Sequence, residues 1–258
     1  MPLLSSARTE DILGVPVAAC DLPGAVGAIS LCLTGNAKTY VSLVAAHSIQ
    51  DARRSQPARV ALTEAGLVVP DGMAVVWLLR MSGHQGAGRV YGPDLMMELC
   101  ARSIEHGWSH FFVGGRPGVR ESLVARLSER FPGLIVAGSL SPEVCEHPRV
   151  EPGVVAMINA SGARIVWVGL GSPKQDQWMH AYREALEPNI LIGVGAAFDF
   201  VAGAKRQAPR WVQRSGLEWL FRWLSEPARL TRRYVRYPEF ATTAGWQLVT
   251  KRLRRLIS

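Results

Sequence analysis

One stretch, RIVWVGLGSPKQDQW at residues 164–178, decides the fold class of this chain. Its apolar, β-branched beginning (165–168) predicts a strand that is buried on both faces. Two glycines then turn the backbone, and Pro173 suits the first position of a helix. Backbone N–H groups and the helix dipole favour the binding of an anion at the turn that contains Gly171, and Lys174 adds a positive charge. A purely structural turn between a strand and a helix fits the pattern equally well.

The same succession of strand, turn and helix recurs along most of the chain. Apolar runs predict strands at residues 40–44, 66–72, 110–115, 134–138, 165–168 and 189–200. Helical patterns follow at residues 47–54, 73–81, 93–106, 117–131, 152–160 and 173–186. This alternation predicts an α/β fold: a Rossmann-like, mostly parallel sheet with helices on both faces and one cleft at the carboxyl ends of the strands.

Positive charge is concentrated at the carboxyl end of the chain. Residues 205–258 hold 13 Lys and Arg against 3 Asp and Glu, whereas residues 1–204 hold 16 against 18. We therefore expect an α/β catalytic core at 1–204 and a basic, Trp- and Arg-rich helical appendage at 205–258. Such an appendage indicates an anionic partner: nucleic acid, an acidic membrane surface or a phosphorylated substrate.

Several classes of protein are disfavoured by what the sequence lacks. The scattered cysteines (Cys20, Cys32, Cys100 and Cys145) are typical of buried thiols and not of disulfides or a zinc site. We expect neither a signal peptide nor a membrane span. The glycine turns match neither the dinucleotide-binding GxGxxG pattern nor a Walker A loop. No DxD pair is present to hold a diphosphate through a metal ion, so backbone amides and basic side chains would balance the charge of a bound nucleotide diphosphate.

Three charged side chains stand where predicted strands end or predicted helices begin. Asp71 ends a strand just before a helix, where it can cap that helix or act as a general base in a dry cleft. Arg89 precedes another predicted helix and can reach a phosphate or face solvent. Asp199 lies near the end of the last predicted strand and can orient a ligand hydroxyl or cap local backbone.

The appendage carries two kinds of helical pattern. Trp211, Trp219 and Trp223 share one face of a predicted helix, which favours packing against a core. After a proline, four arginines recur at helical spacing: Arg229, Arg232, Arg233 and Arg236. A solvated face usually explains such a run, but the scarcity of acidic neighbours favours a phosphate clamp, because guanidinium binds phosphate bidentately. The basic, amphipathic tail suits a membrane interface.

Seven segments bear on the function when they are read together. They are VPDG (69–72), RVYG (89–92), FVGG (112–115), VGLGSPKQ (168–175), GVGAAFD (193–199), GLEWLFR (216–222) and EPAR (226–229). In this order, over residues 40–240, they resemble the WecG/TagA/CpsF glycosyltransferases. These are bacterial enzymes of cell-surface polysaccharide and wall teichoic acid synthesis.

The resemblance implies an inverting, metal-independent transferase with no other cofactor. It implies a UDP-sugar donor and a polyprenyl-diphosphate-linked saccharide as acceptor, with the enzyme peripheral on the inner, cytoplasmic face of the membrane. Asp71 would deprotonate the acceptor hydroxyl as it attacks the anomeric carbon. Gln175 and Arg89 would contact substrate, and the appendage would cover the cleft and hold phosphates. The expected binding residues are Ser42, Arg89, Gly114, Gly115, Gly171, Pro173, Lys174, Gln175, Asp199, Arg222, Arg229, Arg232 and Arg233.

Three positions depart from the family pattern. Val44 stands where members commonly carry the asparagine of Thr-x-Asn, while Ser42 keeps the hydroxyl. The usual Arg-Ala-Pro reads Gln-Ala-Pro at 207–209, with Arg206 one position earlier, and Asp176 replaces a common glutamate. The first departure concerns contacts with the donor sugar, so it points to a different sugar or to weaker activity.

Two other classes of function remain open. A degenerate, non-catalytic family member would hold a nucleotide or lipid diphosphate and recruit partners, and Val44 motivates this alternative. A nucleic-acid-binding protein would use the basic appendage. No recognised nucleic-acid module accompanies the charge, so we expect no nucleic-acid partner.

Overall fold

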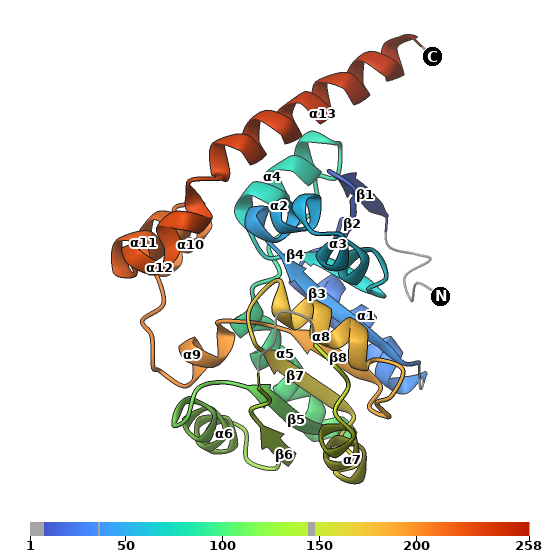
Figure 1. Ribbon diagram of the computed structural model, residues 1–258, viewed down its shortest axis with the longest axis vertical. Helices are drawn as coiled ribbons and strands as arrows, with labels where there is room; N and C mark the ends of the chain where they lie inside the picture. The colour runs from blue at the N-terminus through green and yellow to red at the C-terminus, as the bar shows by residue number, and fades with distance from the viewer. Residues whose placement is uncertain (1–7, 36, 144–147, 258) are drawn as a thin grey trace.

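Six parallel strands form the central sheet of the protein (Figure 1). The computed structural model describes residues 8–35, 37–143 and 148–257, apart from some side chains of the C-terminal helices. The strands are β3 (Thr39–Val44), β4 (Leu67–Pro70), β5 (Ser109–Gly114), β6 (Ile135–Leu140), β7 (Ile165–Gly169) and β8 (Ile190–Gly193). Their order across the sheet is β4-β3-β8-β7-β5-β6. The predicted α/β fold with a parallel sheet is confirmed.

Helices cover both faces of the sheet, because side chains that alternate along each strand are buried on both sides. Trp167 of β7 packs into one layer and its neighbour Val166 packs into the other. The first layer holds α1 (Leu22–Thr34), α5 (Gly92–His106), α6 (Val119–Arg130) and α9 (Ala197–Val201). The second holds α7 (Pro152–Ala160) and α8 (Lys174–Tyr182).

A hairpin that the sequence did not predict precedes the sheet. Its strands β1 (Thr9–Ile12) and β2 (Val15–Ala18) are joined by a two-residue turn in which Leu13 and Gly14 both have positive φ, at 55° and 87°. Such turns match the twist of a hairpin but are usually marked by asparagine and glycine, so leucine at the first position conceals the signal. The hairpin packs in an apolar cluster with α2 (Ala46–Arg54), α3 (Gln56–Thr63) and α4 (Met73–Met81).

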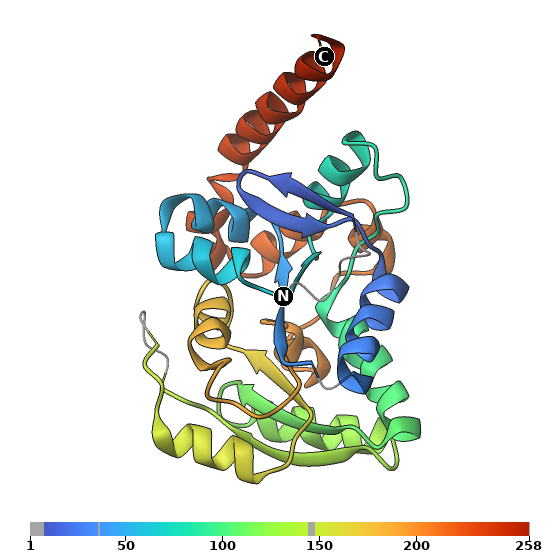
Figure 2. The ribbon, with the colours of Figure 1, turned by 90° about the vertical axis from the view of Figure 1, so that its right-hand side faces the viewer.

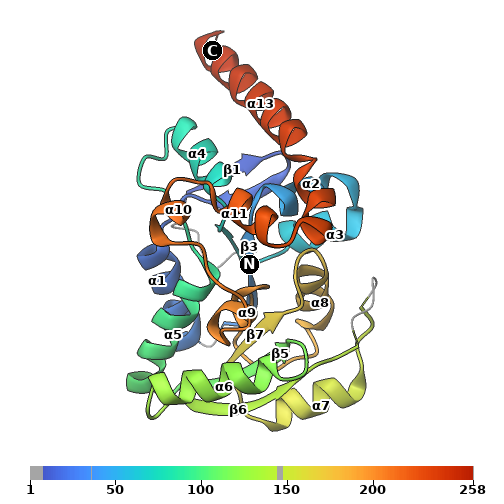
Figure 3. The same ribbon diagram turned by 90° about the vertical axis from the view of Figure 1, so that its left-hand side faces the viewer.

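Within the described residues, α9 is followed by four more helices: α10 (Arg210–Arg214), α11 (Glu218–Ser225), α12 (Pro227–Tyr234) and α13 (Tyr237–Ile257). The predicted tryptophan-bearing helix is in fact two helices, because Gly216 has a φ of 78° and turns the chain between them. Trp211 is 70% exposed, so the expectation that it faces a core was wrong. In Figure 3, α10 and α11 lie beside α2 and α4.

Helix α13 begins on the core and then projects away from it (Figures 1 and 2). Phe240 is buried in the apolar cluster of the hairpin. Further along, the Lys251 ammonium binds a Glu10 carboxylate oxygen at 2.7 Å, and the Leu13 backbone N–H donates to the Gln247 amide oxygen at 3.0 Å. None of the helices in the described ranges combines the length and apolar character that a membrane span requires.

Two predicted boundaries were wrong, and both bear on the site. The last strand was expected to reach Phe200, but β8 ends at Gly193 and helix α9 contains Asp199. Gly195, with a φ of 52°, redirects the chain, and Phe198 then packs into the core from a helix. Helix α8 begins at Lys174, so Pro173 precedes its first turn, and it ends at Tyr182.

Candidate active site

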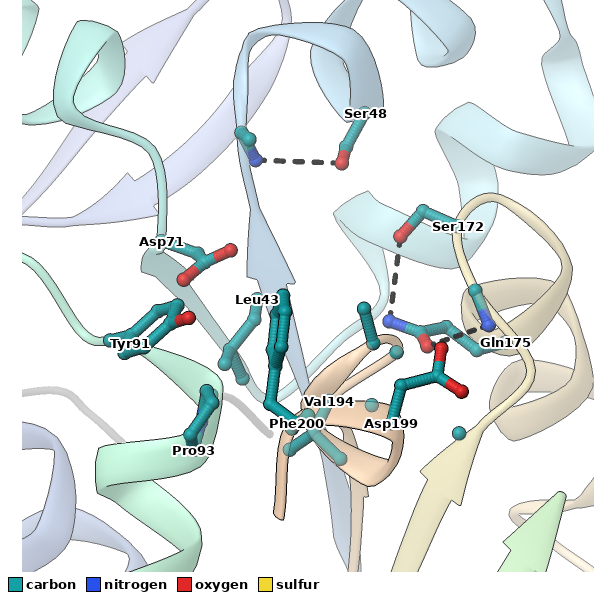
Figure 4. A pocket seen from close by; sticks show the side chains of 18 of the residues that line it. Leu43, Ser48, Asp71, Tyr91, Pro93, Ser172, Gln175, Val194, Asp199 and Phe200 are labelled. Atoms are coloured by element: carbon teal, nitrogen blue, oxygen red, sulfur yellow. Dashed lines mark hydrogen bonds between the residues drawn. The ribbon is translucent and has the colours of Figure 1, made fainter. Parts of the chain in front are cut away.

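The carboxyl ends of four neighbouring strands, β4, β3, β8 and β7, enclose a cavity of about 200 Å³ (Figure 4). Asp71 and Tyr91 lie on one side of this cavity, and Ser172, Gln175 and Asp199 lie on the other. Because carboxylate, hydroxyl, amide and glycine-backbone groups dominate its wall, we call it the polar cavity. Its position agrees with the general rule that open parallel sheets bind ligands beyond the carboxyl ends of their strands.

The glycine turn after β7 is shaped by the side chain of Gln175. The Gly171 N–H donates to the Gln175 amide oxygen at 3.1 Å, and the Gln175 NH₂ group lies 3.4 Å from the Ser172 hydroxyl. Gly171 has a φ of 79°, which L-residues with a side chain rarely adopt. A side chain on Gly193 of β8 would crowd the same place, because its Cβ would lie 2.6 Å from Met179 Cε and 3.0 Å from the Gln175 amide nitrogen. Gln175 therefore both lines the cavity and holds its turn.

A buried carboxyl group lies beneath this turn. Asp176 is 1% exposed, and the Ser172 hydroxyl donates to it at 2.9 Å. Burial raises the pKa of Asp176 to about 6, although the Ser42 and Ser172 hydroxyls act in the opposite direction. Ser42 is fully buried and does not line the cavity. Ser42, which was expected to contact the donor, therefore lies below the cavity floor.

Asp71 is positioned by the sheet and does not cap the helix that follows it. Its backbone N–H donates to the Val44 carbonyl at 2.9 Å. Gly72 occupies the N-cap position of α4 and makes no side-chain cap bond, so the capping interpretation was wrong. One carboxylate oxygen of Asp71 is buried without a hydrogen-bond partner among the described residues. Burial raises the pKa of Asp71 above its usual range, while Arg89 and Arg222 lower it.

Arg89 does not line the polar cavity, but it lines a second cavity that adjoins it. Its Nε donates to the Asp71 carbonyl, and its Nη1 lies 2.5 Å from a carboxylate oxygen of Glu218. Its Nη2 is 3.6 Å from the Asp71 carboxylate, and the guanidinium stacks 4.1 Å from the ring centroid of Tyr91. The side chain of Arg89 is therefore committed to groups of the protein itself.

A second cavity, of about 250 Å³, adjoins the first. Asp71, His47 and Arg222 line both cavities. The rest of the second wall is mainly aromatic and comes from α4 and from the helices after residue 209. Its apolar members are Met73, Trp77, Trp219, Tyr234, Tyr237 and Phe240. We call this space the aromatic cavity. The Asp71 carboxylate thus stands between two spaces of different chemistry.

The structure brings together only part of the predicted residue set. Of that set, the polar cavity is lined by Asp71, Gly171, Gln175, Asp199 and Arg222. The residues that line neither cavity are Ser42, Gly114, Gly115, Pro173 and Lys174. The side chains of Arg229, Arg232 and Arg233 lie outside the described part of the structure, as does Cys145.

Some of these outcomes have a clear physical reason. Gly114 serves packing, because a Cβ on it would lie 2.9 Å from the Gly169 carbonyl oxygen of the adjacent strand. Asp199 was expected to orient a ligand or cap backbone; it lines the cavity and binds the Lys205 ammonium at 3.3 Å. Arg236 lies beyond α12 and is 3.4 Å from the Asp51 carboxylate, so it is not part of a helical arginine face.

Among the residues of the two walls that sequence reasoning missed are His47, Trp77, Tyr91 and Phe200. Tyr91 stood inside the quoted segment RVYG, so the signal was present but was attributed to Arg89 alone. The Tyr91 hydroxyl is buried without a hydrogen-bond partner among the described residues. Within the same ranges, no cluster of three His, Cys, Asp or Glu side chains is arranged to hold a metal ion.

A family model described as "Glycosyl transferase WecG/TagA/CpsF family" matches residues 10–254, nearly the whole chain. The chain belongs to this family. The resemblance inferred from seven short segments is confirmed, and the protein is a WecG/TagA/CpsF glycosyltransferase. The match also includes the hairpin strand β1 and most of α13, which the quoted segments did not reach.

The family assignment gives the Val44 departure a structural setting. In this WecG/TagA/CpsF member, Val44 is fully buried in the apolar cluster with Ile49 and Val75, and its side chain does not line the polar cavity. Its backbone carbonyl still holds Asp71 in place. The loss of an amide at this position therefore leaves the placement of Asp71 intact.

Proposed function

We propose that the protein transfers a sugar, with inversion and without a metal ion, from a UDP-sugar to a polyprenyl-diphosphate-linked saccharide in cell-surface polysaccharide synthesis. One observation carries the proposal: the Asp71 carboxylate faces both the polar cavity and the aromatic cavity. In an inverting transfer the acceptor hydroxyl attacks the anomeric carbon opposite the leaving group, so a base must reach that hydroxyl where the donor space and the acceptor space meet.

The polar cavity suits the donor. Glycine turns after β7 and β8 leave backbone room for a diphosphate, and the positive charge of Arg222 is at the wall. In the proposed step, Asp71 takes the proton of an acceptor hydroxyl while that oxygen bonds to the anomeric carbon. The bond from this carbon to the phosphate oxygen breaks, and UDP leaves with the bonding electrons. The raised pKa of Asp71 makes it a stronger base than an ordinary exposed aspartate.

The aromatic cavity suits the acceptor. Aromatic side chains such as Trp77 and Trp219 stack on sugar rings and pack on apolar chains, whereas glycine turns do not. Nearby, α13 leaves Trp246, Val249 and Leu253 more than half exposed. An exposed apolar stripe on a basic helix favours a membrane interface, so we propose that the enzyme is peripheral on the inner face of the cytoplasmic membrane.

The test measures UDP release from a panel of UDP-sugars, with a short-chain polyprenyl-diphosphate-sugar acceptor and EDTA present. We expect acceptor-dependent release with one donor, and a loss of about 10²–10⁴-fold in Asp71→Asn, the usual contribution of a general base. UDP affinity, measured by calorimetry, is expected to change little. Glu64→Gln, whose side chain is 63% exposed and remote from both cavities, is the matched control and should react normally. A normal rate in Asp71→Asn would exclude it as the base.

A second candidate function is a non-catalytic member that binds a nucleotide or lipid diphosphate. Val44 favours it, because an apolar side chain replaces an amide that family members commonly carry at this position. Under this alternative the protein binds UDP but forms no product, even in a single turnover with enzyme in excess over donor. Product with any UDP-sugar excludes the alternative.

A further inference from the structure

The guanidinium of Arg89 is shared between two carboxylates that lie far apart in the sequence. Glu218, in the first turn of α11, lies 2.5 Å from Nη1, whereas the Asp71 carboxylate lies 3.6 Å from Nη2. Only the first of these distances is a hydrogen bond. Glu218 therefore holds Arg89 more closely than the candidate base does.

This arrangement is buried, so its charges act strongly on one another. The side chain of Glu218 is 9% exposed and that of Arg89 is 16% exposed. An acidic residue in the first turn of a helix often serves only the helix dipole at the surface. Glu218 differs because it is buried and points at a guanidinium of the core, in the wall of the aromatic cavity.

We propose that Glu218 is a positioning residue for the base: by binding Arg89, it prevents a close ion pair between Arg89 and Asp71, and so keeps Asp71 able to accept a proton. The catalytic consequence rests on the proposed function, but the electrostatic effect on Asp71 does not. Because Glu218 belongs to α11, the base acquires its full strength only when α11 is seated against the core.

The charges around Asp71 agree in sign with this role. Burial raises its pKa, Arg89 lowers it, Glu218 raises it and Arg222 lowers it again. The other titratable groups in the two walls around Asp71 are His47, Tyr91, Asp199, Tyr234 and Tyr237. Burial holds the pKa of the Tyr91 hydroxyl above its usual range. Burial alone would lower the pKa of Arg89, but the two carboxylates raise it, so Arg89 stays charged.

The direct test follows the titration of Asp71 in the full-length protein labelled with carboxyl-¹³C aspartate. Asp71→Asn identifies the resonance. Glu218→Gln keeps the shape and an acceptor oxygen but removes the charge, so Arg89 acts undivided on Asp71. We expect the pKa of Asp71 to fall by roughly one unit, the lower end of the effect of a nearby charge. Glu218→Asp, which keeps the charge, is the matched control and should titrate close to wild type.

The second readout is the pH dependence of kcat/KM. Since a lower pKa of Asp71 means deprotonation at lower pH, the acidic limb in Glu218→Gln should move down by about one pH unit. The plateau rate should fall, because the base is weaker, while UDP affinity stays unchanged. A purely structural role would lower the rate without moving the limb.

The outcomes separate this inference from the proposed function. An unchanged Asp71 titration in folded Glu218→Gln overturns the inference, whatever the enzyme assays give. If wild type has no transferase activity but the titration shifts, the electrostatic role stands and the proposed function fails. If Glu218→Gln does not fold, the Glu218→Gln/Arg89→Gln double variant removes both buried charges. Because Arg89 affects Asp71 more than Glu218 does, its Asp71 should then titrate above wild type, and an unchanged value overturns the inference.

Discussion

The polar and aromatic cavities share Asp71 but differ in how they are built. The polar cavity is made mainly by strand ends and the turns that follow them, so the sheet fixes most of its shape, and Arg222 of α11 also lines it. The aromatic cavity exists only where helices α10–α13 lie against α4. Its wall therefore combines residues that are far apart in the sequence, such as Trp77 and Phe240. The wall of the polar cavity thus belongs mainly to the core, whereas the wall of the aromatic cavity forms when the C-terminal helices pack on the core.

This difference suggests a division of tasks around one base. A rigid polar site suits a donor whose diphosphate is always the same, whereas a wall of docked helices can vary with the acceptor. The two sides should therefore respond independently to mutation: changes in the polar cavity should alter donor affinity, and changes in the aromatic cavity should alter acceptor KM. The following predictions test this independence.

The largest expected effect is on the free energy of unfolding, which the buried Asp176 carboxyl beneath the polar cavity lowers at neutral pH. In the folded protein the pKa of Asp176 is about 6, whereas in the unfolded chain it returns to its ordinary value of 3.8. Stability therefore falls as pH rises between these values, by up to about 3 kcal/mol. Asp176→Asn removes this penalty, so urea unfolding should show a more stable variant at pH 7.5 and no gain at pH 4. An equal gain at both pH values would contradict the assigned cause.

A smaller effect is expected from Gly216→Ala in the aromatic cavity. The residue has a φ of 78°, and a Cβ there would lie 2.5 Å from the Trp77 ring. Left-handed backbone costs an alanine about 1–2 kcal/mol, so α11 should seat less well and acceptor KM should rise about tenfold. Gly153→Ala, in open space on α7, is the matched control and should leave both substrates unaffected. A rise in donor Kd equal to that in acceptor KM would show that the two cavities do not respond independently.

Gln175→Ala tests the polar cavity alone. It removes the oxygen that accepts from the Gly171 N–H and so loosens the turn. A hydrogen bond contributes about 1 kcal/mol, so UDP affinity measured by calorimetry should fall about fivefold. Acceptor KM should not change. A change confined to acceptor KM would show that the glycine turn does not hold the donor.

The smallest effect is expected from Tyr91→Phe, which keeps the ring under Arg89 and removes only the hydroxyl. Because that hydroxyl is buried without a partner among the described residues, its loss should stabilise the unliganded protein by about 1 kcal/mol in urea unfolding. If the hydroxyl binds substrate in the polar cavity, UDP or donor affinity falls about threefold in the same variant. Stabilisation without any loss of affinity would assign Tyr91 a role in packing alone.

Local patterns predicted what is local in this fold. The β7–turn–α8 unit and the strand ending at Asp71 were readable because periodicity, glycine and proline lie within a few residues of one another. The glycine turn was placed correctly, but the role of Gln175 in holding it was not foreseen. The hairpin turn at Leu13 and the break at Gly216 were missed because their backbone conformations carry little sequence signal.

What could not be predicted depends on contacts between distant residues. Arg89 was expected to reach a phosphate or face solvent, yet it binds Glu218, which lies 129 positions away in the sequence. Asp71 was open to a capping interpretation until the cap position was seen to be Gly72. Ser42 stands in the family's Thr-x-Asn motif. Because side chains alternate along a strand, it lies below the cavity floor, where its hydroxyl interacts with Asp176.

The late position of α10–α13 in the chain also bears on biosynthesis. The ribosome makes all six strands of the sheet before it makes these helices, and domains begin to fold from the N-terminal side during synthesis. A nascent chain can therefore form all of the polar cavity except Arg222 while the aromatic one still lacks a wall. The hairpin surface that receives Phe240 is likewise exposed until α13 emerges. During translation the unfinished protein thus presents an apolar patch, and the last helices cover it.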